Sequence, residues 1–263
     1  MNDGDDSDEV RLQRLLAEQL RPLAVPREAQ GAMDLAERVR RSAEGQQGLS
    51  TQRREDGIWQ EAAPGAWRRR LREDAALPVE LWRLAAGTRL DWPAASRARE
   101  LLVLEGDVDC GGPLPRYGYR IGDAGPLQVG AAGALVYVRH RLCDAVALDA
   151  AEQRWWSRAP EAALVADEAA PVLRLARGVK AVLLHGSGGV VAMLVRVLGG
   201  ASVPDHGHGL EEDCYVLEGD LYLSDILLRE GDYQLARAGT RHTDCLSDAG
   251  AVFYFRGALP APA

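Results

Sequence analysis

The hydrophobic pattern of the chain changes character near residue 57. Between residues 9 and 43, apolar side chains recur at spacings of three and four, which predicts two amphipathic helices separated near Pro26. Residues 46–57 are polar and contain glycine, as is typical of a linker. Beyond them, short apolar alternations are interrupted by Gly, Pro and Asp roughly every ten residues, which is the pattern of antiparallel strands and turns. We therefore expect an all-β fold, a sandwich or a barrel, behind a short N-terminal helical segment.

An internal repeat divides the β-rich part in two. Residues 65–107 align without gaps with residues 178–220 at an offset of 113, and the run VLEGD occurs once in each copy. The offset becomes 114 and then 117, where GALVYVR at 133–139 parallels GAVFYFR at 250–256. Two copies of one all-β unit follow from this match. The expected segments are an acidic tail with helices (1–56), a first β unit (57–141), a connector (142–170), a second β unit (171–258) and a tail (259–263).

Composition and charge exclude several classes of protein. With 263 residues, 47% of them hydrophobic, the chain can bury a sizeable core. Its formal net charge of -8 argues against non-specific binding to nucleic acid. The acidic start is unlike a secretory signal, and no apolar run is long enough to span a membrane, so we expect a cytoplasmic protein without a membrane partner. The four cysteines are widely spaced, which indicates neither a zinc ribbon nor a disulfide framework.

Histidine is rare, and three of the five histidines fall in a pattern that suits a metal site. His206 and His208 lie two residues apart and so face the same side of a strand, and Glu212 has the same parity. His242 must arrive from another strand. Three imidazole nitrogens and a carboxylate oxygen favour Zn, Fe, Mn, Ni or Co over Mg or Ca. We predict that these four residues bind one divalent transition metal.

Five further residues lie close to this pattern in the sequence. Asp205 and Glu211 adjoin the ligands, and either is expected to accept a hydrogen bond from an imidazole N–H. Cys214 and Cys245 are interpreted as buried small hydrophobes, the alternative being thiols that oxidise beside a redox metal. His185 is expected either to line the pocket or to lie in an exposed turn.

Two stretches of the second copy resemble the cupin motifs. GASVPDHGHGLEEDCYVLEG, residues 200–219, matches every fixed position of the first motif. GDYQLARAGTRHTDCL, residues 231–246, resembles the second motif, although Arg237 replaces the usual proline and Leu246 the usual asparagine. The resemblance implies two tandem cupin barrels of the double-stranded β-helix or jelly-roll type, with the predicted ligands in the second barrel.

The first copy lacks the ligand residues. At the positions that correspond to the four ligands, it carries Pro93, Ala95, Arg99 and Gln128. Because the glycines and the VLEGD run remain, we expect a degenerate cupin barrel that keeps the scaffold and binds no metal.

Among the cupins, the chain most resembles ChrR-type proteins in these motifs. The HxH pair, the Glu-Glu pair, the VLEG turn and a preceding Leu-His are all present, so the chain resembles a bicupin of the ChrR-like family in the RmlC-like cupin superfamily. Some members are anti-sigma factors, in which a helical zinc domain holds a sigma factor. Residues 1–55 here contain neither histidine nor cysteine, so the zinc ligands of that domain are missing.

Three functions are compatible with these features. The first is a regulator or sensor whose metal state changes the arrangement of the barrels or of the N-terminal helices, with a sigma factor or a small molecule as partner. The second is a small-molecule enzyme such as a cupin dioxygenase, in which the metal keeps open positions for O2 and substrate. The third is a structural or ligand-binding bicupin. The fold alone does not choose among them, and whether the protein is an enzyme stays open. Pairing through exposed strands would give a homodimer.

Overall fold

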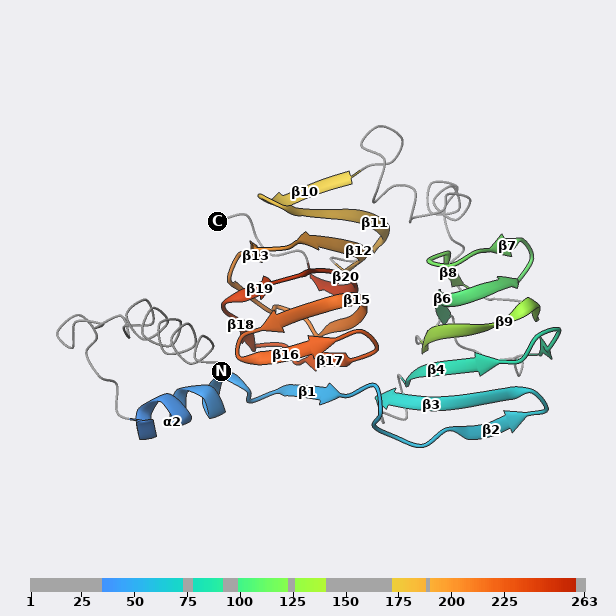
Figure 1. Ribbon diagram of the computed structural model, residues 1–263, viewed down its shortest axis with the longest axis horizontal. Coiled ribbons are helices and arrows are strands. Elements are labelled where there is room, and N and C mark those ends of the chain that lie inside the picture. Colours follow the sequence, from blue (N-terminus) through green and yellow to red (C-terminus); the bar gives the residue numbers. More distant parts are fainter. Residues whose placement is uncertain are drawn as a thin grey trace, which may run out of the picture. The chain divides into compact units, whose positions relative to one another are not determined.

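The computed structural model (Figure 1) describes residues 35–72, 78–91, 99–122, 126–140, 172–187 and 190–258. The chain forms two compact units, residues 1–43 and residues 44–263. Helix α2 (Leu35–Gly45) falls where the second N-terminal helix is predicted. The first predicted helix and the connector 142–170 lie outside the described residues. None of the helices in the described ranges is long and apolar enough to cross a membrane.

Strands dominate the unit of residues 44–263, as the alternating pattern predicts, and those described form antiparallel sheets (Figure 1). The first sheet contains β2 (Gln60–Ala63), β3 (Ala66–Arg72), β4 (Val79–Leu84), β9 (Leu127–His140), β6 (Arg99–Asp109) and β7 (Pro113–Leu114), with β5 (Arg89–Leu90) on β9 and β8 (Tyr119–Gly122) on β6. The second contains β1 (Leu49–Gln52), β17 (Tyr233–Ala236), β15 (Glu212–Leu223), β20 (Gly250–Ala258), β12 (Val190–Leu198), β11 (Val179–Ser187) and β10 (Val172–Ala176), together with β13 (Ala201–Val203), β16 (Ile226–Arg229) and β19 (Cys245–Ser247). A separate pair is formed by β14 (His206–Gly207) and β18 (Arg241–His242).

The two large sheets repeat one strand order. The path β3-β4-β9-β6 in the first corresponds to β11-β12-β20-β15 in the second, as the sequence repeat requires. Gly106 in β6 and Gly219 in β15 occupy the same strand position in the two copies, with φ of +71° and +75°. A Cβ at either position would lie 1.9 or 2.0 Å from the carbonyl oxygen of Gly133 or Gly250. These glycines are therefore required both for the backbone conformation and for the close approach of two strands.

Within the described residues, apolar side chains form three cores. One lies within the first sheet and includes Val103 and Val136, and another lies within the second and includes Val216 and Phe253. The third is shared, because it joins residues such as Leu81 of the first sheet to residues of the second. The two sheets therefore pack on each other through an apolar layer of their own.

One stretch differs from the sequence-based expectation. Residues 49–52, within the predicted linker, form β1, which pairs with β17 so that Thr51 lies opposite Gln234. The chain thus contributes a strand to the second sheet before it enters the first (Figure 1). The sequence LSTQ is short and mostly polar, so it carries no hydrophobic alternation, and only its long-range pairing reveals the strand.

Candidate metal centre

The four predicted ligands converge at one end of the second sheet, although not from a single regular strand. His206 begins β14 and pairs with His242 of β18, whereas His208 follows β14 and Glu212 begins β15. The short β14–β18 ladder therefore brings residues 36 positions apart into register. Strand pairing, and not the alternation of side chains along one strand, gathers the ligands.

The ligand atoms surround the Glu212 carboxylate. His208 Nε2 lies 3.3 Å from Oε2, His206 Nε2 lies 3.7 Å from Oε2, and His242 Nδ1 lies 3.5 Å from Oε1. One potential ligand atom from each of the four residues lies within 4.8 Å of all the others. The three separations from Glu212 are smaller than the ~4.2 Å span of two metal–ligand bonds of ~2.1 Å, so one ion can contact both members of each pair.

In each imidazole, the inner nitrogen faces Glu212 and the outer nitrogen faces away from it. Each outer nitrogen has a hydrogen-bond acceptor. His206 Nδ1 lies 2.9 Å from the Pro204 carbonyl oxygen, and His242 Nε2 lies 3.1 Å from Gln234 Oε1. His208 Nδ1 lies 2.7 Å from Thr240 Oγ1, whose own proton is donated to a backbone carbonyl. Each outer nitrogen therefore carries the proton, and each inner nitrogen presents a lone pair to the centre.

The buried histidines fit a cation. His208 Nε2 and His242 Nδ1 are buried and make no hydrogen bond in the described part of the chain. Burial, reinforced by the neighbouring imidazoles, lowers the pKa of His242 to about 3, and burial also lowers the pKa of His208. The pKa of His206 is raised: burial opposes its charge, but Glu212 and the Pro204 carbonyl outweigh that effect. Two neutral rings with inward lone pairs beside a carboxylate form a donor set that a divalent transition metal satisfies.

The predicted partners Asp205 and Glu211 do not accept from an imidazole, so that prediction is wrong. Asp205 Oδ1 accepts from the backbone N–H of Asp244, and Glu211 pairs with Arg72 at 2.8 Å. Both carboxylates lie beside a ligand in the sequence, but successive residues of extended chain point to opposite sides. Gln234 and Thr240 take the expected role instead, and no local motif identifies them.

A hydrogen-bonded path connects His242 to the N-terminal strand. Gln234 Nε2 donates to Thr51 Oγ1 at 3.1 Å while Gln234 Oε1 accepts from His242. Gln234 and His242 are each only 1% exposed. Strand β1, in the predicted linker, therefore helps to orient a predicted ligand.

The cysteines near the centre are part of the core. Cys214 and Cys245 are 2% and 0% exposed and pack within the second sheet's own core. Burial raises the pKa of Cys245 to about 12 and raises that of Cys214 as well, so both thiols are protonated at neutral pH. This supports the interpretation as small hydrophobes. His185 is likewise buried, on β11, and does not lie in an exposed turn.

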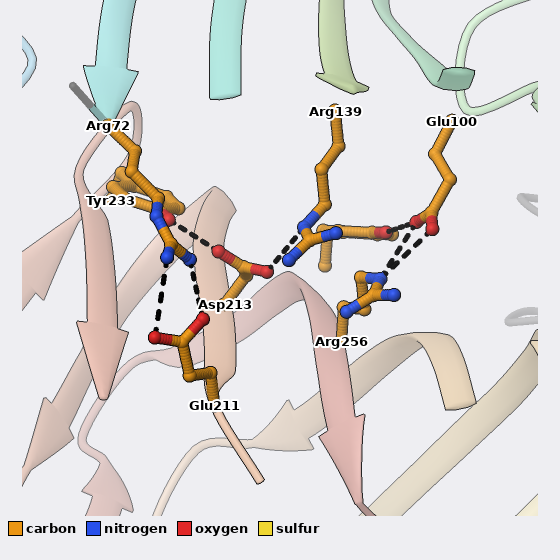
Figure 2. Close-up of polar contacts among 8 residues, drawn as sticks. Arg72, Glu100, Arg139, Glu211, Asp213, Tyr233 and Arg256 are labelled. Carbon is orange, nitrogen blue, oxygen red and sulfur yellow. Dashed lines mark hydrogen bonds and ion pairs between the residues drawn. The ribbon is translucent and has the colours of Figure 1, made fainter. Parts of the chain in front are cut away.

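The residues on either side of Glu212 bind arginines of the first sheet (Figure 2). Asp213 is fully buried and accepts from Arg139 Nε at 2.8 Å and from a tyrosine hydroxyl, that of Tyr233. Glu211 accepts from Arg72 at 2.8 Å. Glu212 therefore points toward the metal centre from a segment whose two neighbours are fixed by the facing sheet.

A second buried pair mirrors the first (Figure 2). Arg256 Nε of the second sheet lies 3.0 Å from Glu100 of the first, and Tyr254 donates to the same carboxylate. By the repeat offsets of 113 and 117, Glu100 corresponds to Asp213 and Arg256 to Arg139. The interface between the sheets is thus reciprocal, with each copy donating an arginine and accepting on a carboxylate.

Comparisons with known proteins agree with this fold. Residues 160–261 match the family model of the ChrR Cupin-like domain. A candidate dioxygenase from Nostoc punctiforme is similar in structure, with a TM-score of 0.61 and 13% identity over 82% of this chain and 87% of that one. A mutant oxalate decarboxylase from Bacillus subtilis gives a TM-score of 0.56 and 12% identity over 81% and 78% of the two chains. AerE from Microcystis aeruginosa gives a TM-score of 0.58 and 13% identity over 77% of this chain and 97% of that one. No curated protein matches the sequence.

Fold and site together define an all-β protein of cupin type with a three-histidine, one-glutamate cluster that could hold a metal. At 12–13% identity the solved structures establish the fold alone. Within that class, the part of the chain that carries the cluster is similar to the ChrR Cupin-like domain.

Proposed function

We propose that the protein is a metal-dependent regulator or sensor, a ChrR-like bicupin of the RmlC-like superfamily with one transition-metal site in its C-terminal barrel. The observation that carries the proposal is the position of Glu212 between Glu211 and Asp213, both of which pair with the first sheet. A change at the metal would alter the Glu212 carboxylate. Because its neighbours are anchored, that change reaches the contact between the sheets.

The N-terminal strand provides a second route out of the site. Thr51 of β1 bonds to Gln234, which in turn bonds to His242. A ligand shift at His242 therefore changes a contact of β1, the strand that follows α2. The partner that we propose is a sigma factor held through residues 1–56, as the ChrR resemblance implies, in the cytoplasm.

Hydrogen–deuterium exchange with and without Zn²⁺ tests this coupling. We expect metal to slow exchange in β1 and at the end of β9 near Arg139, as well as around the ligands. A His206→Ala/His208→Ala variant is the control, because it keeps both routes and loses two ligands. If slowing were confined to residues 204–212 and 234–245, the site would be isolated and the regulatory proposal would fail. Metal-dependent co-purification of a sigma factor tests the partner.

The alternative is a metalloenzyme, such as a dioxygenase, that uses the same site. It is favoured by the similarity to the candidate dioxygenase and to oxalate decarboxylase. A bound iron or manganese ion would supply Lewis-acid and redox chemistry. The chain's own part is to hold the inner nitrogens of His208 and His242 deprotonated and to place the apolar ring of Phe255 near Glu212. Oxygen uptake by the iron-loaded protein with β-diketones, thiols and flavonols tests this alternative: turnover that His242→Ala abolishes would establish it.

A further inference from the structure

A cleft of about 500 Å³ lies between the two sheets, apart from the metal centre. Its wall includes strands of both sheets, with Leu81 and Leu104 from the first and Tyr215 and Leu217 from the second. None of the four predicted metal ligands lines it. Four arginines do, namely Arg54, Arg69, Arg83 and Arg116. Glu105 and Glu230 also line it, so the arginines outnumber the carboxylates and positive charge is in excess over an apolar floor.

Arg69 is the least expected of these residues, because it is only 4% exposed and its guanidinium forms no ion pair within 4 Å in the described part of the chain. Its Nη1 donates to the backbone carbonyls of Arg54 and Asp56, while its buried Nε makes no hydrogen bond there. Burial is the main cause that lowers the pKa of Arg69, and the nearby charge of Arg83 lowers it further, whereas Tyr215, Asp56 and Glu55 act in the opposite direction. A buried guanidinium that no carboxylate contacts directly is costly, and an anion would offset that cost.

The repeat shows that the fold does not require an arginine at this position. At the offset of 113, Arg69 corresponds to Val182, and the register agrees, because Arg69 pairs with Leu81 and Val182 with Leu194. Both residues are 4% exposed, and Val182 belongs to the apolar core shared by the sheets. The second copy thus fills the position with an aliphatic side chain, and the first copy carries a charge that packing alone does not explain.

The cleft also contains an unneutralised arginine on an aromatic ring. The Arg83 guanidinium lies 4.3 Å from the ring centroid of Trp59, and that of Arg69 lies 5.5 Å from it. Arg54 lies 3.5 Å from Glu230, and Arg116 pairs at 2.8 Å with a glutamate outside the cleft. Arg83, like Arg69, forms no ion pair within 4 Å among the described residues. Two of the four arginines are therefore available to a bound anion.

From this arrangement we infer that the inter-sheet cleft binds a small aromatic carboxylate, with the carboxylate on Arg69 and Arg83 and the ring beside Trp59. The volume suits a small molecule, since such sites span about 300–1,000 Å³. The apolar wall excludes water from the ring, and the guanidiniums provide charge-assisted hydrogen bonds in a planar fork. This binding goes beyond the proposed function and does not depend on the metal.

Calorimetric titration of the full chain with benzoate tests the inference, with and without Zn²⁺. We expect saturable binding to one site, weakened about tenfold or more in Arg69→Val and in Arg83→Ala, since each removes a charged donor. Arg69→Val introduces the residue of the second copy, so it should fold, and Arg83 is exposed, so its replacement leaves the core intact. The matched control is Arg196→Ala, the second-copy counterpart of Arg83, which should bind benzoate like the unmodified protein.

Two comparison ligands separate charge from shape. Benzyl alcohol, which is neutral, and acetate, which lacks a ring, should each bind at least about tenfold more weakly than benzoate, because each lacks one half of the recognition. The inference is overturned if benzoate does not bind, or if Arg69→Val binds it unchanged. Binding that disappears in the His206→Ala/His208→Ala variant would also overturn it, since the anion would then sit on the metal.

Discussion

Replacing Gln234 by methionine tests whether the bond behind His242 prepares the metal centre. Methionine keeps the length of the side chain but provides no comparable acceptor, so the His242 Nε2–H loses its 3.1 Å contact with Oε1. Both residues are 1% exposed, so water does not replace the lost acceptor. The imidazole proton can then move to Nδ1, which faces Glu212 Oε1 at 3.5 Å and is the predicted ligand atom. Metal binding must displace that proton.

The expected loss of metal affinity follows from the loss of the hydrogen bond between His242 and Gln234. Removing a partner that orients a ligating histidine reduces metal affinity by about 10–100-fold, which corresponds to ~1.4–2.7 kcal/mol. The unpaired N–H costs about 1–3 kcal/mol of folding stability in addition, with or without metal. Thr51→Val is the graded control, because it removes the partner of the Gln234 amide and leaves the acceptor in place. Its loss of affinity should be the smaller of the two.

Competition between the protein and a chelator for Zn²⁺ measures the affinity directly. Circular dichroism and urea unfolding of each variant confirm that the fold is retained. If folded Gln234→Met bound Zn²⁺ within about twofold of the unmodified protein, well under the ~10-fold minimum, the hydrogen bond would not set the tautomer. The hydrogen bonds from His242 through Gln234 to Thr51 would then not couple the metal centre to β1.

Three further predictions concern stability. Asp213→Ala leaves Arg139 buried without its partner, so it should lower the free energy of unfolding by ~3–5 kcal/mol in urea titrations, whereas Arg139→Met/Asp213→Leu should cost less. In chelator-treated protein the pKa of His242 is about 3, below its unfolded value of ~6.5, so its contribution to folding stability is complete above pH ~6.5 and is lost as the pH falls toward 3. Urea unfolding midpoints measured across this pH range should show that loss, and the His242→Gln variant should lack this contribution. Gly219→Ala places a Cβ 2.0 Å from a carbonyl oxygen, so its melting temperature should fall further than that of Gly200→Ala, which meets no atom within 4 Å and carries only the ~1–2 kcal/mol of left-handed backbone.

The sequence predicts the strands and the ligand set because both depend on local rules. Alternation identifies strands, and the repeat relates equivalent positions in the two copies, such as Gly106 and Gly219. The four predicted ligand residues lie together, but the geometry differs from the expectation: β14 is only two residues long, and Glu212 starts a new strand. Pairing with His242 across β14–β18 replaces strand parity as the cause.

The contacts that support the site could not be predicted, because they join residues far apart in the sequence. Gln234 and Thr51 are separated by 183 positions, and Arg139 and Asp213 by 74. No periodicity or spacing rule relates such positions. Arg69 is a different case, since its register with Val182 is present in the sequence repeat, and comparing the two copies position by position would have marked a charge at a core site.

The two copies share their interface and differ in their sites. Each half of the interface needs the other, since Arg139 requires Asp213 and Arg256 requires Glu100, and removing one member leaves a buried charge unpaired. The ligand positions carry no such mutual constraint, because a copy without the four ligand residues keeps the same strand order and the same positive-φ glycines. A duplicated fold of this kind can carry a candidate metal centre in one copy and a charge such as Arg69 in the other while the interface between the sheets stays the same. The predicted metal centre and the proposed anion cleft are therefore separate sites on one scaffold, and variants of one should leave ligand binding at the other intact.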